Sequence, residues 1–189
     1  AFGTWVHQVA ANHLLNVKAG RQEGVSFDRF AEQLEQGLAF HQRAPEKTPY
    51  DAAVVEEGKL RCTLAMLTCL DRDLRLAYIL GEVLELAGEE AAAILGCEPA
   101  TFRKRLSRAR TLVEDFAQGH CGLVNPANRC RCSKQVHAGV ALGLIDPRRL
   151  LFQTHPVVGS PLARAVVDLA EIKSAAQLLR SHPQYRAPV

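Results

Sequence analysis

Apolar positions recur along this chain at helical spacing, and almost nowhere do they alternate as they would in a strand. The pattern therefore predicts an all-α fold with strand content close to nil. Helices are expected over residues 1–19, 27–40, 53–69, 72–86, 89–95, 99–116, 135–143 and 162–180, with a further weak helix opening at 146.

Within these helices the spacing indicates which side chains are buried. Leu60, Leu64 and Leu67 fall on one face of the 53–69 helix. Asp71 stands at the break that follows and is expected to cap the next helix. Asp146-Pro147 predicts another cap, here followed by a proline in the first turn.

The stretch from 86 to 116 carries the clearest signal. Gly96 can adopt the positive φ that ends the short Ala-rich helix, and Pro99 suits the first turn of the next one. The second helix carries one apolar stripe, made of Phe102, Leu106, Ala109, Val113 and Phe116. A small helix, a glycine turn and a longer helix are typical of a helix-turn-helix.

Cations crowd the second helix off its apolar stripe: Arg103, Lys104, Arg105, Arg108 and Arg110. No acid appears before Glu114, whereas an ordinary solvated helix face mixes both signs. The pattern favours a helix that enters the major groove of DNA over a merely exposed face.

The modest net charge of the whole chain indicates that the positive charge is concentrated in this helix. The 189 residues have a net charge of +3 and are 48% hydrophobic, so one or two small domains with a real core are expected. No run is long and apolar enough to span a membrane and no signal peptide is evident, so we expect no membrane partner and a cytoplasmic location. The chain opens with Ala, and its first helix is expected to be the end of a domain whose earlier part is absent.

The linker is placed in the proline-containing stretch after the second predicted helix, HQRAPEKTPY. The expected fold class is an all-α four-helix domain with a wingless helix-turn-helix, plus one helix before it and a helical extension after it. The predicted units are 1–41, the linker 42–52, the helix-turn-helix domain 53–117, a Cys-containing loop 118–134 and the helical extension 135–189.

Two segments resemble bacterial RNA polymerase sigma factors of the extracytoplasmic-function (ECF) group. Residues 60–112, with ILG at 94–96 and TFRKRLSRAR at 101–110, resemble region 4 of that family. FGTWV at 2–6 and VAAN at 9–12 resemble the end of region 2, in the order that the family has. Most of region 2 is missing from this chain.

This resemblance implies a sigma factor that directs RNA polymerase to promoters, with the 99–116 helix reading the −35 element. Its implied partners are promoter DNA and core RNA polymerase, with an anti-sigma factor as a further candidate. The candidate DNA-binding residues are Ala100, Thr101, Arg103, Lys104, Arg105, Ser107, Arg108 and Arg110. Of these, Ala100, Arg103, Lys104 and Ser107 are expected to face bases, and Arg105, Arg108 and Arg110 to face phosphates.

Other functions stay open at this point. A stand-alone helix-turn-helix regulator that dimerises through the 162–180 helix is the alternative. An enzyme has little support, because no nucleophile–base pair, phosphate loop or paired-carboxylate motif is evident. The extension would either support the DNA-binding domain or mask its recognition helix.

The six cysteines of this chain suggest thiols in a reducing compartment rather than disulfides. Cys121, Cys130 and Cys132, with His120, are weak candidates for zinc ligands, because Cys-x-Cys is not the usual knuckle spacing. A redox switch is the other option, since the flanking cations Arg129, Arg131 and Lys134 would lower thiol pKa values. Ordinary reduced thiols remain the leading interpretation, and no cofactor is expected. Cys62, Cys69 and Cys97 are expected to be small core residues.

Overall fold

A computed structural model describes residues 24–43, 50–150 and 174–180, and every described element is helical. The helices are α2 Phe27–Arg43, α3 Ala52–Thr68, α4 Arg72–Tyr78, the π-helical η1 Ile79–Val83, α5 Gly88–Leu95, α6 Pro99–His120, α7 Cys132–Ala141 and α9 Ala175–Arg180. The all-α prediction is confirmed for this part of the chain. None of these helices is long and apolar enough to cross a bilayer.

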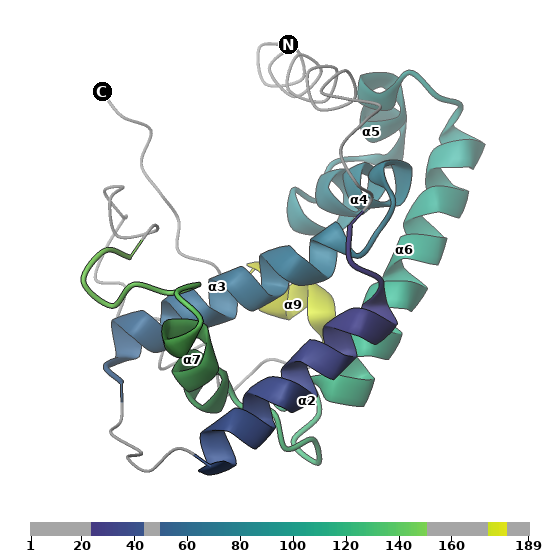
Figure 1. The fold of residues 1–189 in the computed structure, drawn as a ribbon. Coiled ribbons are helices and arrows are strands. Elements are labelled where there is room, and N and C mark those ends of the chain that lie inside the picture. The colour runs from purple at the N-terminus through teal and green to yellow at the C-terminus, as the bar shows by residue number, and fades with distance from the viewer. Residues whose placement is uncertain (1–23, 44–49, 151–173, 181–189) are drawn as a thin grey trace.

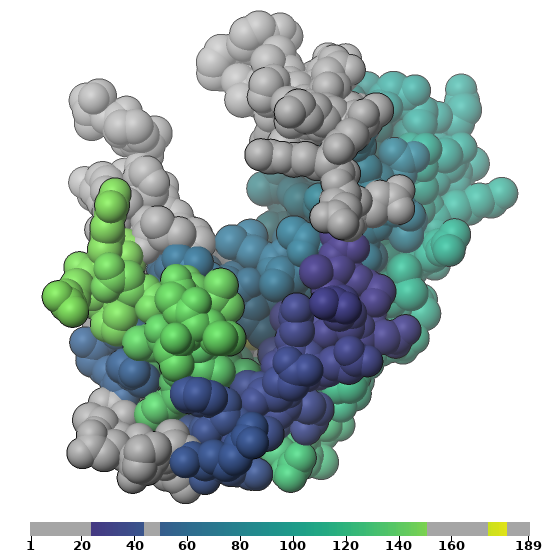
Figure 2. Space-filling model, viewed as in Figure 1, coloured from purple at the N-terminus to yellow at the C-terminus, as the bar shows by residue number. Residues whose placement is uncertain are grey.

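Helix α3 runs through the middle of the molecule and separates two regions (Figure 1). At one end lie α4, η1, α5 and the start of α6, and at the other end lies α7 with the turn that follows it (Figures 1 and 2). The main hydrophobic core draws on α2, α3, α4, α6 and α9. In it the Phe30 and Phe116 rings of α2 and α6 stack with centroids 5.3 Å apart. The segment before the predicted linker therefore packs into the same core as the helix-turn-helix.

Two aspartates cap the central helices, Asp71 as predicted and Asp51 in addition. The side chain of Asp51 accepts a hydrogen bond from the backbone N–H of Val54 at 3.0 Å, and that of Asp71 accepts one from Leu74 at 2.8 Å. Each satisfies an N–H that the first helical turn leaves without a partner.

The predicted face of α3 is wrong at one position. Leu60 and Leu67 are buried, but Leu64 is 43% exposed. Polar residues occupy the buried face in its place, because local bonds satisfy them: Glu57 pairs with Arg61 at 2.6 Å, and the Thr63 hydroxyl donates to backbone carbonyls one turn back.

The helix predicted over 72–86 is shorter and irregular. It begins as α4, widens into the π-helix η1 and ends at Val83. The Leu84 N–H donates to the Ile79 carbonyl five residues earlier, at 2.9 Å. Gly81 lies in this segment against α6, and a Cβ there would stand 2.6 Å from Leu106 Cδ2, so close packing requires glycine.

The turn between α5 and α6 has the predicted form. Gly96 has φ +62°, a left-handed conformation that costs other residues free energy, and it ends α5. Pro99 opens α6. Helix α6 runs to His120, one turn beyond the predicted end, and its five-residue apolar stripe is buried throughout.

The extension differs more from prediction. Helix α7 begins at Cys132, three residues before the predicted start. The helix expected from Asp146-Pro147 is wrong: the segment is a turn, which Asp146 closes by accepting from the Arg148 N–H at 2.9 Å. Of the helix predicted over 162–180, the described part is α9. The helix predicted over 1–19 and the resemblance at 2–12 lie outside the described residues.

Candidate nucleic-acid interface

Helix α6 presents two chemically opposite faces. Its apolar stripe packs into the domain, with Phe102 and Ala109 almost fully buried. Its other side, at the N-terminal half, is polar and open to solvent. The predicted contact residues Ala100, Thr101, Arg103, Lys104, Ser107 and Arg108 are all exposed there.

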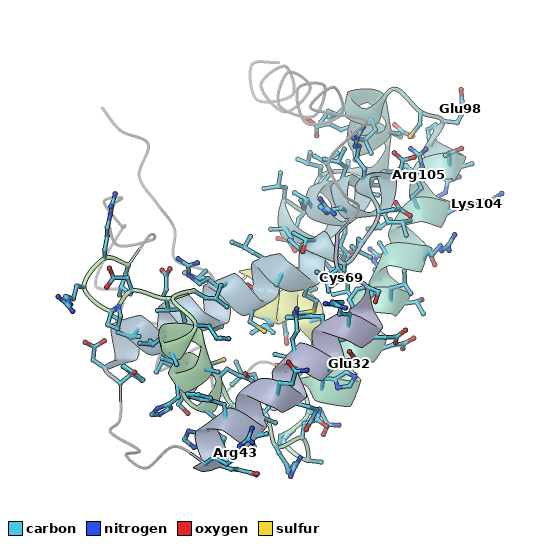
Figure 3. The ribbon with its side chains drawn as sticks, in the orientation of Figure 1. Glu32, Arg43, Cys69, Glu98, Lys104 and Arg105 are labelled. Carbon is cyan, nitrogen blue, oxygen red and sulfur yellow. The ribbon has the colours of Figure 1, made fainter. Side chains whose placement is uncertain are left out.

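Three cations on this surface have no intramolecular partner within the described part of the chain: Arg103, Lys104 and Arg108 form no ion pair there. Figure 3 shows Lys104 pointing away from the body of the molecule. The N-terminal half of α6 thus projects positive charge into solvent, with the geometry that a DNA groove accepts. We refer to Arg103, Lys104 and Arg108 as the basic face.

The other two cations of the helix are engaged within the fold. The Arg105 guanidinium pairs with the Asp73 carboxylate of α4. The Arg110 Nε donates to Glu82 Oε1 of η1 at 2.6 Å. The two pairs tie α6 to α4 and η1, one on each side of its buried stripe.

Helix α9 reaches the same network from the end of the described chain. Its Arg180 lies 3.8 Å from Glu82 and also pairs with Glu85, a residue with φ +53°. Leu178 and Leu179 are each 2% exposed and belong to the main core. The Glu114 carboxylate accepts the Ala175 N–H at 3.0 Å, so α9 rests on η1 and on the C-terminal half of α6, away from the basic face.

The linear sequence gives no sign of the partners of Arg105 and Arg110. Asp73 and Glu82 stand 32 and 28 positions before Arg105 and Arg110 respectively, and no motif links them. Only the packing of α4 and η1 against α6 brings them together. No signal in the linear pattern distinguishes the cations held by these pairs from those of the basic face.

The cysteine loop between α6 and α7 is closed by its own hydrogen bonds. The Arg131 guanidinium donates to the carbonyls of Asn128 and Cys130, at 2.6 and 2.7 Å. The Asn128 side chain donates to the carbonyls of Gln118 and Cys121, at 2.9 and 3.3 Å. All six cysteines of the chain are free and half-buried.

The expected lowering of the thiol pKa values by nearby cations is not found at Cys130 or Cys132. Burial raises the pKa of Cys130 above its ordinary value and the pKa of Cys132 to about 12. The cations are occupied elsewhere: Arg129 pairs with Glu35 at 3.2 Å, and the Lys134 ammonium donates to the Arg129 carbonyl. Neutral thiols of this kind react slowly with oxidants.

The metal candidates of the loop are only partly brought together. His120 lies against Phe116, with ring centroids 4.8 Å apart. Among the described residues, no three His, Cys, Asp or Glu side chains already stand at metal-binding spacing.

The segment that contains the basic face is similar to a known protein family. Residues 60–113 match the family "Sigma-70, region 4". The chain is 34% identical over 122 residues to the ECF RNA polymerase sigma-E factor of Escherichia coli (strain K12), covering 62% of each protein, and equally to that of Salmonella typhimurium (strain LT2). It is 26% identical over 120 residues to the ECF RNA polymerase sigma factor SigE of Mycolicibacterium smegmatis, covering 63% of this chain and 44% of that protein. No solved structure matches the chain significantly.

Proposed function

We propose that this chain, a relative of the ECF sigma factors whose residues 60–113 belong to the sigma-70 region 4 family, directs RNA polymerase to promoters. Its alignment spans about three fifths of the relatives' length, 62%. Region 4 of the ECF group reads the −35 element, and α6 is the helix that would do so here. The partners in this proposal are promoter DNA and core RNA polymerase, in the cytoplasm, with an anti-sigma factor as a regulator.

The observation that carries the proposal is the basic face of α6. Arg103, Lys104 and Arg108 are exposed and unpaired among the described residues, at the N-terminal half of the second helix of a helix-turn-helix. Recognition helices present their N-terminal residues to base edges in the major groove. Removing water from three cations that have no ion-pair partner among the described residues costs free energy. Contacts with phosphates and guanine edges offset this cost.

The ion pairs of α6 refine the expected roles. Arg103 and Lys104 remain the candidates for base contact, with Ala100 and Ser107 beside them, and Arg108 for phosphate contact. Arg105 and Arg110 instead hold the angle of α6 through Asp73 and Glu82. Thr101 is exposed in the first turn, where its hydroxyl can reach a phosphate.

Helix α9 bears on the alternative function. A regulator that dimerised through the 162–180 helix would need its apolar face free, but Leu178 and Leu179 are buried within their own chain. The position of α9 also supports a stabilising role for the extension rather than a masking one, because its contacts fall on Glu82, Glu85 and Glu114.

A pull-down with core RNA polymerase tests the proposal. The purified chain should bind core polymerase and, in the complex, retain duplexes from a randomised library that share one −35-like sequence. A chain that selects an operator equally well without polymerase would instead be an independent regulator.

Separate alanine substitutions test the roles within the basic face. Arg103→Ala should change the base preferred at one position, at a cost of about 1–3 kcal/mol for the favoured base. Arg108→Ala should weaken all sequences alike and lower the salt dependence of binding. Selection with each variant in complex with core polymerase measures both effects.

The exposed Arg29 of α2 provides a matched control, and Arg29→Ala should leave DNA selection unchanged. A changed preference from Arg108→Ala, together with a uniform loss from Arg103→Ala, would reverse the two assignments.

A further inference from the structure

Four of the six cysteines converge on one place, although the loop motif contains only three of them. The fourth is Cys62, near the middle of α3 and 59 positions before Cys121. The convergence follows from how α3 packs on α7 and from how the loop closes.

The contact between α3 and α7 is antiparallel and close. A Cβ on Gly58 would stand 2.7 Å from Val136 Cγ2, so these two residues face each other. The start of α3 and the end of α7 also share a cluster that contains Val54 and, packed against it, Val140. One helical turn beyond the Gly58–Val136 contact, the facing residues are Cys62 and Cys132.

The closed loop adds the other two thiols. A Cβ on Gly122 would stand 2.1 Å from the Cys130 carbonyl oxygen, so the backbone beside Cys121 abuts the backbone of Cys130. The Gln135 side chain of α7 donates to the Cys130 sulfur at 3.6 Å and to the Leu34 carbonyl of α2 at 2.7 Å. Cys130 is thereby held over the first turn of α7, next to Cys132.

The electrostatics of the thiols agrees with this packing. The pKa of Cys62 is raised well above its ordinary value, first by burial and then by Cys132, Cys121 and Cys130. Beyond the effect of burial, Cys121 and Cys130 raise the pKa of Cys132, and Cys121 raises that of Cys130. Every pair within the set of four is therefore close enough to interact. The thiols are neutral as they stand, and all four could ionise together only around a cation.

We propose that Cys62, Cys121, Cys130 and Cys132 bind one Zn²⁺ ion as a structural site with four thiolate ligands. This set differs from the one that the loop sequence suggests, because Cys62 takes the place of His120. Each thiol that becomes a ligand releases its proton to water, and no oxidation takes place.

The side chains must turn to reach this geometry, since no three ligands already stand at metal-binding spacing in the described residues. A cysteine has one side-chain torsion, and a change of rotamer moves its sulfur by about 3 Å. Lys59 lies near Cys132 and acts to lower its pKa, while Glu56, which pairs with the Lys59 ammonium at 2.6 Å, acts to raise it. The Gln135 amide would orient Cys130 as an outer hydrogen-bond donor.

The consequence is a metal staple between the extension and the DNA-binding domain. Cys62 lies within residues 60–113, whereas the other three ligands follow that domain. The bound ion would fix α7 and its loop onto α3, on the side of the molecule away from the basic face. This inference does not depend on the proposed promoter recognition.

Zinc content of the purified full chain tests the proposal, with four variants compared side by side. The wild-type chain and His120→Ala should each retain about one Zn²⁺ per chain after gel filtration without chelator. Cys62→Ser and Cys132→Ser should lose it, and Cys97→Ser, a half-buried cysteine outside the cluster, should keep it.

Titration with Co²⁺ covers the case in which a variant fails to fold. The wild-type chain, stripped of metal, should give the thiolate-to-cobalt absorption and the visible bands of a tetrahedral site. The proposal is overturned if the wild-type chain binds neither Zn²⁺ nor Co²⁺, if it carries iron and sulfide instead, or if His120→Ala loses zinc while Cys62→Ser retains it.

Discussion

The helix-turn-helix of α5 and α6 and the cysteine loop with α7 are built on different principles. The turn and the buried stripe of the first follow from residues close in sequence: Gly96 ends one helix, Pro99 starts the next, and one stripe packs inward. The second is held by contacts between distant residues, such as Gln135 with Leu34. The structure of the first region can be predicted from the local sequence. The structure of the second depends on which distant segments pack against it.

The largest expected loss of stability comes from a substitution in the core of the helix-turn-helix. Phe102 is 1% exposed in the cluster formed by η1, α4, α5 and α6. Phe102→Ala should lower the free energy of unfolding by about 3–5 kcal/mol, because it leaves a cavity that the short helices cannot fill. Denaturant unfolding measures the loss.

Leu112 is the matched position on the same helix, 37% exposed. Leu112→Ala should change stability by no more than about 0.5 kcal/mol. Equal losses for the two variants would contradict the packing described for α6.

A smaller effect tests the turn. Gly96→Ala should cost about 1–2 kcal/mol, because an L side chain is strained at φ +62°. Nothing lies within 4 Å of a Cβ at this position, so a steric clash contributes no part of the loss. Gly96→Asn should recover part of it, since Asn tolerates this conformation better, and thermal unfolding compares the three chains.

The smallest effect concerns the long-range contact. Gly58→Ala should destabilise the α3–α7 contact by about 1 kcal/mol, because Val136 is fully buried and stiff and cannot move aside. Hydrogen exchange should rise in α7 and remain unchanged in α6.

The control is Gly119→Ala in α6, where a Cβ meets nothing within 4 Å. Alanine there should stabilise the helix by about 0.5–1 kcal/mol. Faster exchange in α6 than in α7 after Gly58→Ala would show that the two regions are not independent.

The same difference explains what the sequence could and could not predict. The helix-turn-helix, its buried stripe and its exposed contact residues could be predicted, because periodicity and turn chemistry act over a few residues. Leu64 was misplaced because the local bonds of Glu57 and Thr63 allow polar groups on the buried face of α3. Tertiary packing determines the ion pairs of Arg105 and Arg110 and the position of Cys62 beside the loop. The periodicity of the sequence does not predict them.

Helix α9 has a consequence for the order in which the protein can form during synthesis. Leu178 and Leu179 complete a core that also contains Phe30 of α2. The ribosome must therefore add 149 residues after Phe30, up to Leu179, before that core can close. Contacts between such distant residues form slowly. Until they form, the nascent chain would expose the apolar residues that α9 covers. This is the interval in which chaperones would be most needed.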